Sequence, residues 1–358
     1  MALECAWRKY ARMVVNVKFI HVADIHLGAI PEKGKPWAEN REREIWDTFI
    51  ELIKRAEKEQ VDFLFIAGDL FHRQPLLREL KEVNYLFSTL GKTKVILMAG
   101  NHDYIRRDSY YRNFDWEENV SFLKSPRIER VYFPEENVEV YGGSYYDKKI
   151  REPIYDRIMP IDKTRINILI AHGGDEKHAP MNERQLALNG FDYIALGHRH
   201  TQVVFLENRI INPGNIEPLD INETGKKGYF IGELTKETCH TQFIPLAKRN
   251  YIHLHIKVKT STTLLALQRV VEEKIEELGK HHMYKLIIVG FREEGIQYEE
   301  ESLLRLGNIC QVVDNTEPDY DLEDIYQKNK NNMLGMYVKQ FTDKDELTKM
   351  ERKALNYG

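Results

Sequence analysis

Five short motifs place histidine, aspartate and asparagine in an order that could build a metal site. They are Asp24-x-His26, Gly68-Asp69, Gly100-Asn101-His102-Asp103, His172 and Gly197-His198-Arg199-His200. Imidazole, carboxylate and amide oxygen without thiolate suit manganese, iron or zinc rather than a structural zinc site. Two such ions about 3.5–4 Å apart clamp a phosphate, lower the pKa of a bridging water and stabilise charge on the attacking and leaving oxygens. The predicted chemistry is hydrolysis of a phosphate ester.

The motifs follow short apolar runs that are typical of strands buried on both faces. These runs cover residues 17–23, 63–67, 95–99, 166–171 and 193–196. In α/β sheets the loops after the strands meet at one rim, where ligands bind. One Asp-x-His alone would be weak, because a histidine after a strand is often a surface group or a helix cap. Five ordered motifs, each at the end of a strand, predict a shared site.

Two amphipathic patterns, at residues 41–59 and 76–90, separate the first three strands and predict helices. Alternating strands and helices predict parallel pairing with right-handed crossovers. From residue 120 on, the expected elements are shorter and mostly strands, at 138–141, 203–206, 210–212, 229–234 and 241–244. The expected fold is α/β, with two packed mixed β-sheets flanked by helices and a small α/β cap domain.

A chain of 358 residues is long enough for two domains. Residues 1–16 are expected to form a leader that is either disordered or foreign to the protein. Residues 17–248 carry all the motifs and are expected to form the large domain, and residues 249–318 the cap. Residues 319–358 are charged and helix-favouring, with apolar positions too scattered for a core of their own. We expect this tail to dock on a partner or on the cap.

Composition excludes several classes of protein. No run approaches the roughly 18 apolar residues of a membrane span, and the N-terminus lacks the apolar core of a signal peptide. Cys5, Cys239 and Cys310 are far apart, which argues against a disulfide framework and favours the cytoplasm. The formal charge of −4 argues against nucleic acid. Two bound divalent cations and local basic loops would outweigh that charge at the site itself.

The motif order resembles that of the calcineurin-like metallophosphoesterases, which is DxH, GD, GNH[DE], H and GHxH. More narrowly, the chain looks like the SbcD branch, the nuclease subunit of the SbcCD DNA-repair complex, and its YhaO-type relatives. Three segments favour this branch: residues 21–28, residues 68–72, and residues 212–215 followed by 227–229. Serine/threonine phosphatases instead carry an Asp-Arg pair and a Glu where this chain has His72 and Asp103. The resemblance is specific over residues 17–244 and looser beyond.

By position, the resemblance implies two groups of metal ligands that share Asp69. The first ion would be held by Asp24, His26, Asp69 and His200, and the second by Asp69, Asn101, His172 and His198. The implied cofactors are two divalent ions, Mn²⁺ first, with Fe, Zn or Mg as alternatives.

The resemblance also implies roles for three further side chains. His102 would act as general acid or transition-state stabiliser, oriented by Asp103, and His72 would contact the phosphate or the leaving group. Asn215 stands where the family often has serine, so a substrate contact at that position stays open.

His21 lies within a strand, out of phase with the site, and is expected in the core.

The loop after the third motif interleaves basic and aromatic side chains, which suits contacts with a nucleic-acid backbone and its bases. The candidate DNA contacts are Arg106, Arg107, Tyr110 and Arg112. An ordinary solvated loop with packed tyrosines explains the same pattern equally well. Two weaker candidate basic rims are Lys33, Lys35, Arg41 and Arg43, and Lys148, Lys149 and Arg151.

The sequence therefore predicts a metal-dependent DNA nuclease, an exonuclease or endonuclease of DNA repair and recombination. The implied partners are DNA and a coiled-coil ABC-type ATPase of the SbcC kind, with a homodimer left open. One alternative is a small-molecule metallophosphodiesterase. Another is a DNA-end-binding scaffold with weak catalysis. Strand polarity and the preferred DNA structure are not encoded in the motifs.

Overall fold

The computed structural model describes residues 16–342, 344, 347–348, 350–351 and 354–355. The leader expected at residues 1–16 therefore lies, except for Asn16, outside the described residues, as does Cys5. The chain divides into two compact units, one ending at Tyr251 and the other starting at Ile252. Each unit has a hydrophobic core of its own.

The first sheet of the large unit has six strands in the order β12-β11-β1-β2-β3-β4. Strands β1 to β4 pair in parallel, whereas β11 runs antiparallel to β1 and β12 antiparallel to β11. The strands are β1 (Val17–Val22), β2 (Phe63–Ala67), β3 (Lys94–Met98), β4 (Val120–Phe122), β11 (Gly228–Leu234) and β12 (Cys239–Pro245).

The second sheet has the order β5-β6-β7-β8-β10-β9. Its four central strands are parallel, and the two edge strands are antiparallel to their neighbours. The strands are β5 (Glu129–Phe133), β6 (Val138–Gly142), β7 (Ile166–His172), β8 (Tyr193–Gly197), β9 (Val203–Leu206) and β10 (Ile210–Asn212). Both sheets are mixed.

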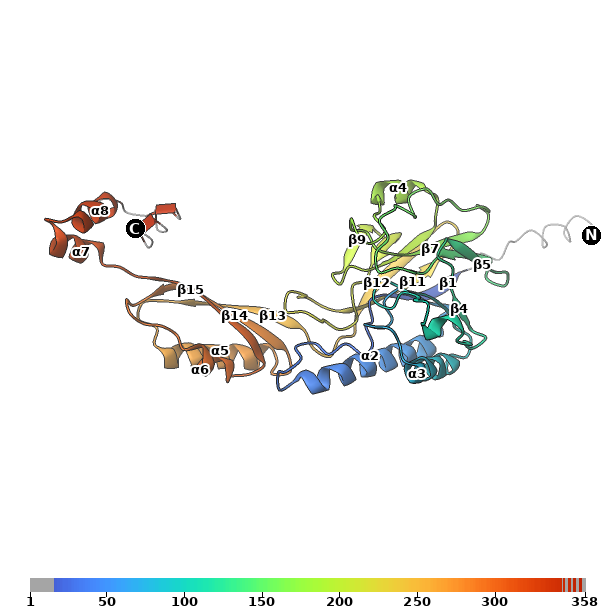
Figure 1. The fold of residues 1–358 in the computed structure, drawn as a ribbon, viewed down its shortest axis with the longest axis horizontal. Coiled ribbons are helices and arrows are strands. Elements are labelled where there is room, and N and C mark those ends of the chain that lie inside the picture. The colour runs from blue at the N-terminus through green and yellow to red at the C-terminus, as the bar shows by residue number, and fades with distance from the viewer. Residues whose placement is uncertain (1–15, 343, 345–346, 349, 352–353, 356–358) are drawn as a thin grey trace, which may run out of the picture. The chain divides into compact units, whose positions relative to one another are not determined.

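Helices cover the outer faces of the two sheets (Figure 1). The helices α2 (Ala38–Lys58) and α3 (Leu77–Ser88) lie together on the first sheet, and α4 (Glu183–Leu188) lies on the opposite side of the unit. The stripe of α2 that faces the sheet is buried at Ile45, Phe49, Leu52, Ile53 and Ala56. A separate cluster that includes Phe19, Phe65 and Ile168 fills the space between the sheets. The predicted fold class is confirmed.

His21 of β1 links the two sheets beneath their rim. Its Nδ1 lies 2.9 Å from the Tyr193 hydroxyl, and its Nε2 lies 3.1 Å from the Leu196 carbonyl oxygen. Both partners belong to β8. Burial lowers the pKa of His21 to about 3, so the ring is neutral at physiological pH. This is the core position that the alternation of β1 predicts.

The second unit contains a three-stranded sheet in the order β13-β14-β15, with β14 and β15 parallel. Its core includes Leu267, Val271 and Ile275 from the buried face of α5. The elements are β13 (Tyr251–Val258), α5 (Leu264–Leu278), β14 (Met283–Arg292), α6 (Glu300–Leu304), β15 (Ile309–Pro318), α7 (Leu322–Asn329) and α8 (Met333–Thr342). No helix among the described residues combines the length and apolarity that crossing a membrane requires.

Candidate metal centre

The motif residues meet at the carboxyl ends of strands from both sheets. The first sheet contributes the residues that follow β1, β2 and β3, and the second contributes the end of β7 and the turn after β8. The side chains brought together are Asp24, His26, Asp69, Asn101, His172, His198 and His200. All seven lie within one small space, which we call the cage.

The first group of predicted ligands meets around His26 and His200. Their Nε2 atoms are 2.9 Å apart, and ligand atoms of these two residues and Asp24 lie within 4.8 Å of one another. An Asp69 oxygen is 3.9 Å from His26 Nε2. Asp24, His26 and Asp69 are buried.

The second group meets around the side-chain oxygen of Asn101. His172 Nε2 and His198 Nδ1 each lie 2.9 Å from Asn101 Oδ1. The Asp69 oxygen that faces His26 is also 3.3 Å from His172 Nε2. Asp69 is therefore the carboxylate that reaches both groups, as a bridging ligand must.

Three of the imidazoles are held from outside the cage by oxygen atoms. His172 Nδ1 faces the Ala67 carbonyl at 2.9 Å, His198 Nε2 faces Asp175 at 2.7 Å, and His200 Nδ1 faces Glu223 at 2.6 Å. Carbonyl and carboxylate oxygens only accept hydrogen bonds, so each of these nitrogens carries the proton. The other ring nitrogen points into the cage, as metal-ligating histidines require.

The cage brings acceptor atoms together as a cation site does. With its proton on Nε2, the lone pair of His198 Nδ1 faces the lone pairs of Asn101 Oδ1. This repulsion is relieved when the two atoms share a positive ion. The nitrogen and oxygen donors, without sulfur, suit a transition metal such as manganese, iron or zinc. The residues present therefore fit the divalent ions.

Burial and neighbouring charges shift the pKa values inside the cage. Burial raises the pKa of Asp24 to about 6. For Asp69 burial acts in the same direction, but the charges of His172 and His26 outweigh it and lower the pKa. Burial would lower the pKa of His172, but Asp69 raises it to about 9. A metal ion held by His172 would take the place of that proton.

The backbone of the motifs adopts conformations that few residues tolerate. Asp24, His26 and Asp69 have φ angles of 50°, 54° and 50°, and His198 has 91°. Such left-handed residues cluster at functional sites, where the surrounding fold has to hold them. Gly68 and Gly100 leave room for the ligands, because a Cβ at either would lie 2.3 Å from His172 Nδ1 or from an Asp69 oxygen.

His102 and His72 lie beside the cage. The rings of His102 and His26 have centres 4.8 Å apart, and those of His102 and His72 are 5.0 Å apart. The backbone N–H of His102 donates to Asp69 at 2.8 Å. His72 is exposed and His102 is half-buried, so both can reach a bound phosphate.

Asp103 does not contact His102 in the way that the resemblance implies. Its carboxylate is buried and accepts hydrogen bonds from the Gly100 N–H, the Phe71 N–H and the Tyr111 hydroxyl, at 2.8, 3.2 and 2.9 Å. His102 Nδ1 instead lies 3.1 Å from the His72 carbonyl oxygen. Asp103 thus ties the two loops that carry His72 and His102, and the carbonyl group orients the ring.

Asp175 and Glu223 are the site residues that sequence reasoning missed. Asp175 lies three positions after His172, and also accepts from His178 Nδ1 at 2.8 Å. Glu223 lies in the loop before β11, 23 positions after His200. Neither belongs to a motif, and only the folded chain brings them to the histidines.

Residues 17–202 match the family model described as Calcineurin-like phosphoesterase. The chain belongs to this family. The resemblance drawn from the motifs is confirmed, and membership indicates a hydrolase of phosphate esters that uses divalent metal ions.

Curated relatives of this phosphoesterase share about a quarter of its sequence. It is 28% identical to the "Uncharacterized metallophosphoesterase YhaO" of Bacillus subtilis, over 75% of this chain and 70% of that protein. It is 28% identical to the "DNA double-strand break repair protein Mre11" of Archaeoglobus fulgidus, over 74% of this chain and 64% of that protein. It is 26% identical to a nuclease SbcCD subunit of Staphylococcus epidermidis, over 64% of this chain and 70% of that protein.

The candidate DNA-contacting residues of the phosphoesterase differ in whether their side chains already form hydrogen bonds within the protein. Arg106 forms two hydrogen bonds with Asp108, at 3.0 and 2.6 Å, and Arg112 donates to the Arg106 carbonyl oxygen at 2.7 Å. Arg107 and Tyr110 are exposed, and neither side chain forms a hydrogen bond or ion pair with the described residues. Arg107 and Tyr110 are therefore the members best able to contact a substrate.

Arg41, expected on a basic rim, is buried. It donates to Glu44 at 2.7 Å, to Glu217 at 3.4 Å and to the Pro218 carbonyl oxygen at 2.8 Å. The expectation was wrong because the first turn of α2 lies over the segment at Glu217. Lys33, Lys35 and Arg43 remain exposed.

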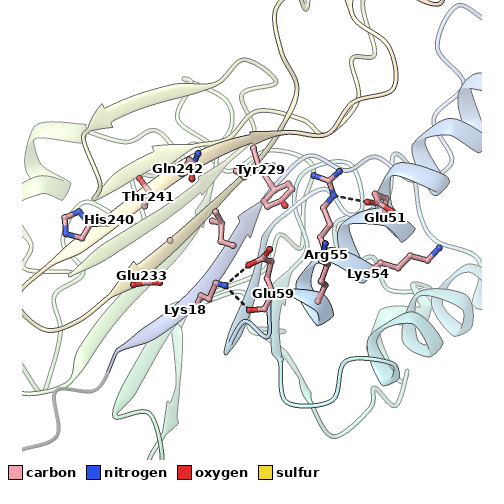
Figure 2. A pocket seen from close by; sticks show the side chains of 14 residues that line it. Lys18, Glu51, Lys54, Arg55, Glu59, Tyr229, Glu233, His240, Thr241 and Gln242 are labelled. Atoms are coloured by element: carbon pink, nitrogen blue, oxygen red, sulfur yellow. Dashed lines mark hydrogen bonds and ion pairs between the residues drawn. The ribbon is translucent and has the colours of Figure 1, made fainter.

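A groove of about 790 Å³ opens on the large unit between α2 and the strands β11 and β12 (Figure 2). Figure 2 shows that its charges are partly paired, Lys18 with Glu59 and Arg55 with Glu51. None of the cage residues lines it. The groove is separate from the metal centre.

Proposed function

We propose that this phosphoesterase is a metal-dependent DNA nuclease that hydrolyses phosphodiester bonds in DNA repair. The observation that carries the proposal is the pair of imidazoles, His72 and His102, beside the cage with their ring centres 5.0 Å apart. A phosphodiester held at the cage would meet both rings. The names of two relatives, a DNA double-strand break repair protein and a nuclease subunit, support DNA as the substrate.

His102, His72 and Asp103 have different roles in the proposed reaction. When the cage residues hold two divalent ions, the ions would supply an activated water and neutralise charge on the phosphate. The His102 ring is held by the His72 carbonyl oxygen, and the His102 backbone N–H donates to Asp69. In this position His102 presents its Nε2 to the leaving oxygen as general acid. His72 hydrogen bonds to the phosphate. Asp103 keeps the loops of the two histidines together through Gly100 and Phe71.

Manganese is the proposed metal. The cage offers imidazole nitrogens, carboxylates and an amide oxygen, a mixed set that manganese, iron and zinc accept and that magnesium accepts less readily. We propose the ligand groups Asp24, His26, Asp69 and His200 for one ion, and Asp69, Asn101, His172 and His198 for the other.

The proposed DNA contacts lie in the loop of residues 104–112. Tyr111 anchors this loop on Asp103, and the Ile105 N–H donates to the Tyr145 carbonyl oxygen at 2.7 Å. The anchored loop displays Arg107 for a backbone phosphate and Tyr110, 51% exposed, for a base. Arg106 and Arg112 hold the shape of the loop, because each is engaged within it.

The proposed partner is a coiled-coil ABC-type ATPase of the SbcC kind. Helix α8 exposes Met333, Leu334 and Met336 while it buries Val338 and Phe341. Exposed apolar residues on one helix suit a groove or helix of another protein. We propose residues 17–248 as the nuclease domain, 249–318 as the cap and 319–358 as the docking tail, in a cytoplasmic protein. A homodimer is compatible with this arrangement.

A nuclease assay across metals tests the proposal. The full chain is freed of metal, loaded with Mn²⁺, Mg²⁺ or Zn²⁺, and incubated with linear duplex DNA, hairpin DNA and a small phosphodiester. We expect Mn²⁺-dependent cleavage of DNA. Efficient hydrolysis of the small phosphodiester with intact DNA would establish the small-molecule phosphodiesterase instead. DNA binding without any hydrolysis would establish a scaffold.

A further inference from the structure

Two carboxylates stand directly behind the two histidines of the Gly197-to-His200 turn. His198 and His200 follow β8 and are two positions apart, and the resemblance assigns them to different ions. Glu223 lies behind His200, and Asp175 lies behind His198. The two carboxylates come from different loops, one before β11 and the other after β7.

We infer that Glu223 and Asp175 are positioning residues, each setting the affinity of one metal ion through the histidine that it holds. The inference rests on the metal centre of the proposed function, and it does not depend on DNA being the substrate.

Glu223 is held so that only one of its oxygens serves His200. Its Oε2 accepts from the Asn215 amide at 2.6 Å and from the Leu219 N–H at 2.8 Å, which leaves Oε1 for His200 Nδ1 at 2.6 Å. Lys227 also donates to the His200 carbonyl oxygen at 2.6 Å. Ring and backbone of His200 are thus fixed by groups outside the cage. Asn215, whose role the motifs left open, acts on Glu223.

Asp175 holds His198 from a more exposed position. The Oδ2 atom lies 2.7 Å from His198 Nε2 and 2.8 Å from His178 Nδ1, and Oδ1 accepts from the Lys177 N–H at 2.7 Å. The carboxylate is 49% exposed. Asp175 therefore aims His198 Nδ1 at Asn101 without being part of the packed core.

An amide cannot replace either carboxylate. Among the described residues, the hydrogen-bond partners of the Glu223 and Asp175 oxygens are N–H donors. A glutamine or asparagine of the same shape would turn an NH₂ group toward at least one of these donors, and the ring would lose its fixed tautomer or its direction. Loss of such an outer carboxylate typically lowers metal affinity about 10–100-fold.

Calorimetric titration of the metal-free full chain with Mn²⁺ tests the inference. His26→Ala and Asn101→Ala first establish which binding step belongs to which ion. We expect Glu223→Gln to weaken the step that His26→Ala removes, by roughly 10–100-fold, and to leave the other step unchanged. Asp175→Asn should weaken the step that Asn101→Ala removes. Glu207→Gln, on an exposed residue of the β9–β10 turn, is the matched control.

A positioning residue weakens only one of the two Mn²⁺-binding steps, which distinguishes it from a residue with a structural role. A merely structural carboxylate would lower the melting temperature of the metal-free chain and weaken both steps together, and that result would overturn the inference. Mn²⁺ affinities of Glu223→Gln and Asp175→Asn identical to those of Glu207→Gln would also overturn the inference. If Glu223→Gln does not fold, Asn215→Ala keeps the carboxylate and should weaken the same step to a smaller degree. Intact DNA alongside the expected binding shifts would refute only the nuclease proposal.

Discussion

At the scale of single residues, His102 has the clearest experimental signature. Its ring contacts the His72 carbonyl, and it is not among the proposed ligands. We expect His102→Ala to lower kcat by about 10²–10⁴-fold, the usual contribution of a general acid, while Mn²⁺ affinity stays the same. Steady-state rates on DNA and calorimetry measure the two quantities. His240→Ala, an exposed histidine in the groove of Figure 2, is the control and should change neither. Undiminished turnover in His102→Ala would exclude this role.

Two neighbouring arginines should respond differently to salt. Arg107 is exposed, whereas Arg106 is already paired with Asp108. A single phosphate contact changes the slope of log K against log salt concentration by about 1. We therefore expect Arg107→Ala to reduce the slope for DNA binding by about 1, and Arg106→Ala to reduce it by less. Fluorescence anisotropy over a salt series measures both, and equal slopes in the two variants would remove Arg107 from the proposed interface.

At the scale of elements, Glu79 connects the start of α3 to the loop that carries His72. It accepts from the Leu76 N–H at 2.8 Å and forms two hydrogen bonds with Arg73, at 2.9 and 2.7 Å. Burial alone would raise the pKa of Glu79, but Arg73 and the Leu76 N–H outweigh it and lower the pKa. Because its folded-state pKa is lowered, the Glu79 carboxylate adds to the stability of the fold at pH values above its ordinary pKa of 4.5. This added stability is lost as the pH falls through the folded-state pKa.

Glu79→Gln should therefore flatten the acid side of the stability curve. Urea unfolding of the metal-free chain at several pH values measures this effect. We expect the variant to be about 1 kcal/mol less stable at neutral pH, with a difference from the parent chain that shrinks below about pH 4.5. A pH-independent difference would show that the charge of Glu79 does not contribute.

The elements also show what a sequence can and cannot predict. A helix was expected at residues 76–90, and α3 is found at Leu77–Ser88, because Leu80, Val83 and Phe87 recur at helical spacing and form its buried face. Strand β5 and helix α4 were missed. Strand β5 alternates between half-buried and exposed residues, and α4 has only six residues, so neither leaves a strong hydrophobic pattern.

Some parts of the candidate site could likewise be predicted from the sequence, and others could not. The meeting of the cage residues could be predicted because each proposed ligand lies in a short motif next to a strand with a clear apolar run. The partners of the proposed ligands could not be predicted, since the contact of Glu223 with His200 depends on how a loop folds back, and that of Asp103 with Phe71 depends on the packing of two loops. The burial of Arg41 was missed for the same reason: Glu217 is 176 positions away.

At the scale of the whole molecule, the two units have separate cores, and all the proposed ligands lie before Tyr251. Mn²⁺ held by the proposed ligands would stabilise the large unit alone, by about 2.7 kcal/mol at a hundred times Kd. We expect calorimetric heating to resolve two transitions, with Mn²⁺ raising the Tm of only one. In Asn101→Ala this shift should be smaller. Equal shifts of both transitions would show that the units unfold together.

The cage also has a consequence for how the protein is made. Its first proposed ligands are Asp24 and His26, its last are His198 and His200, and Glu223 comes later still in the chain. A ribosome has to add about half of the chain after the first ligands before the last ones exist, and β10 and β11 must then each pair within its own sheet. A chain released early carries aspartates and histidines but no complete cage. Hydrolysis at the cage therefore requires that the large unit has first been synthesised and folded.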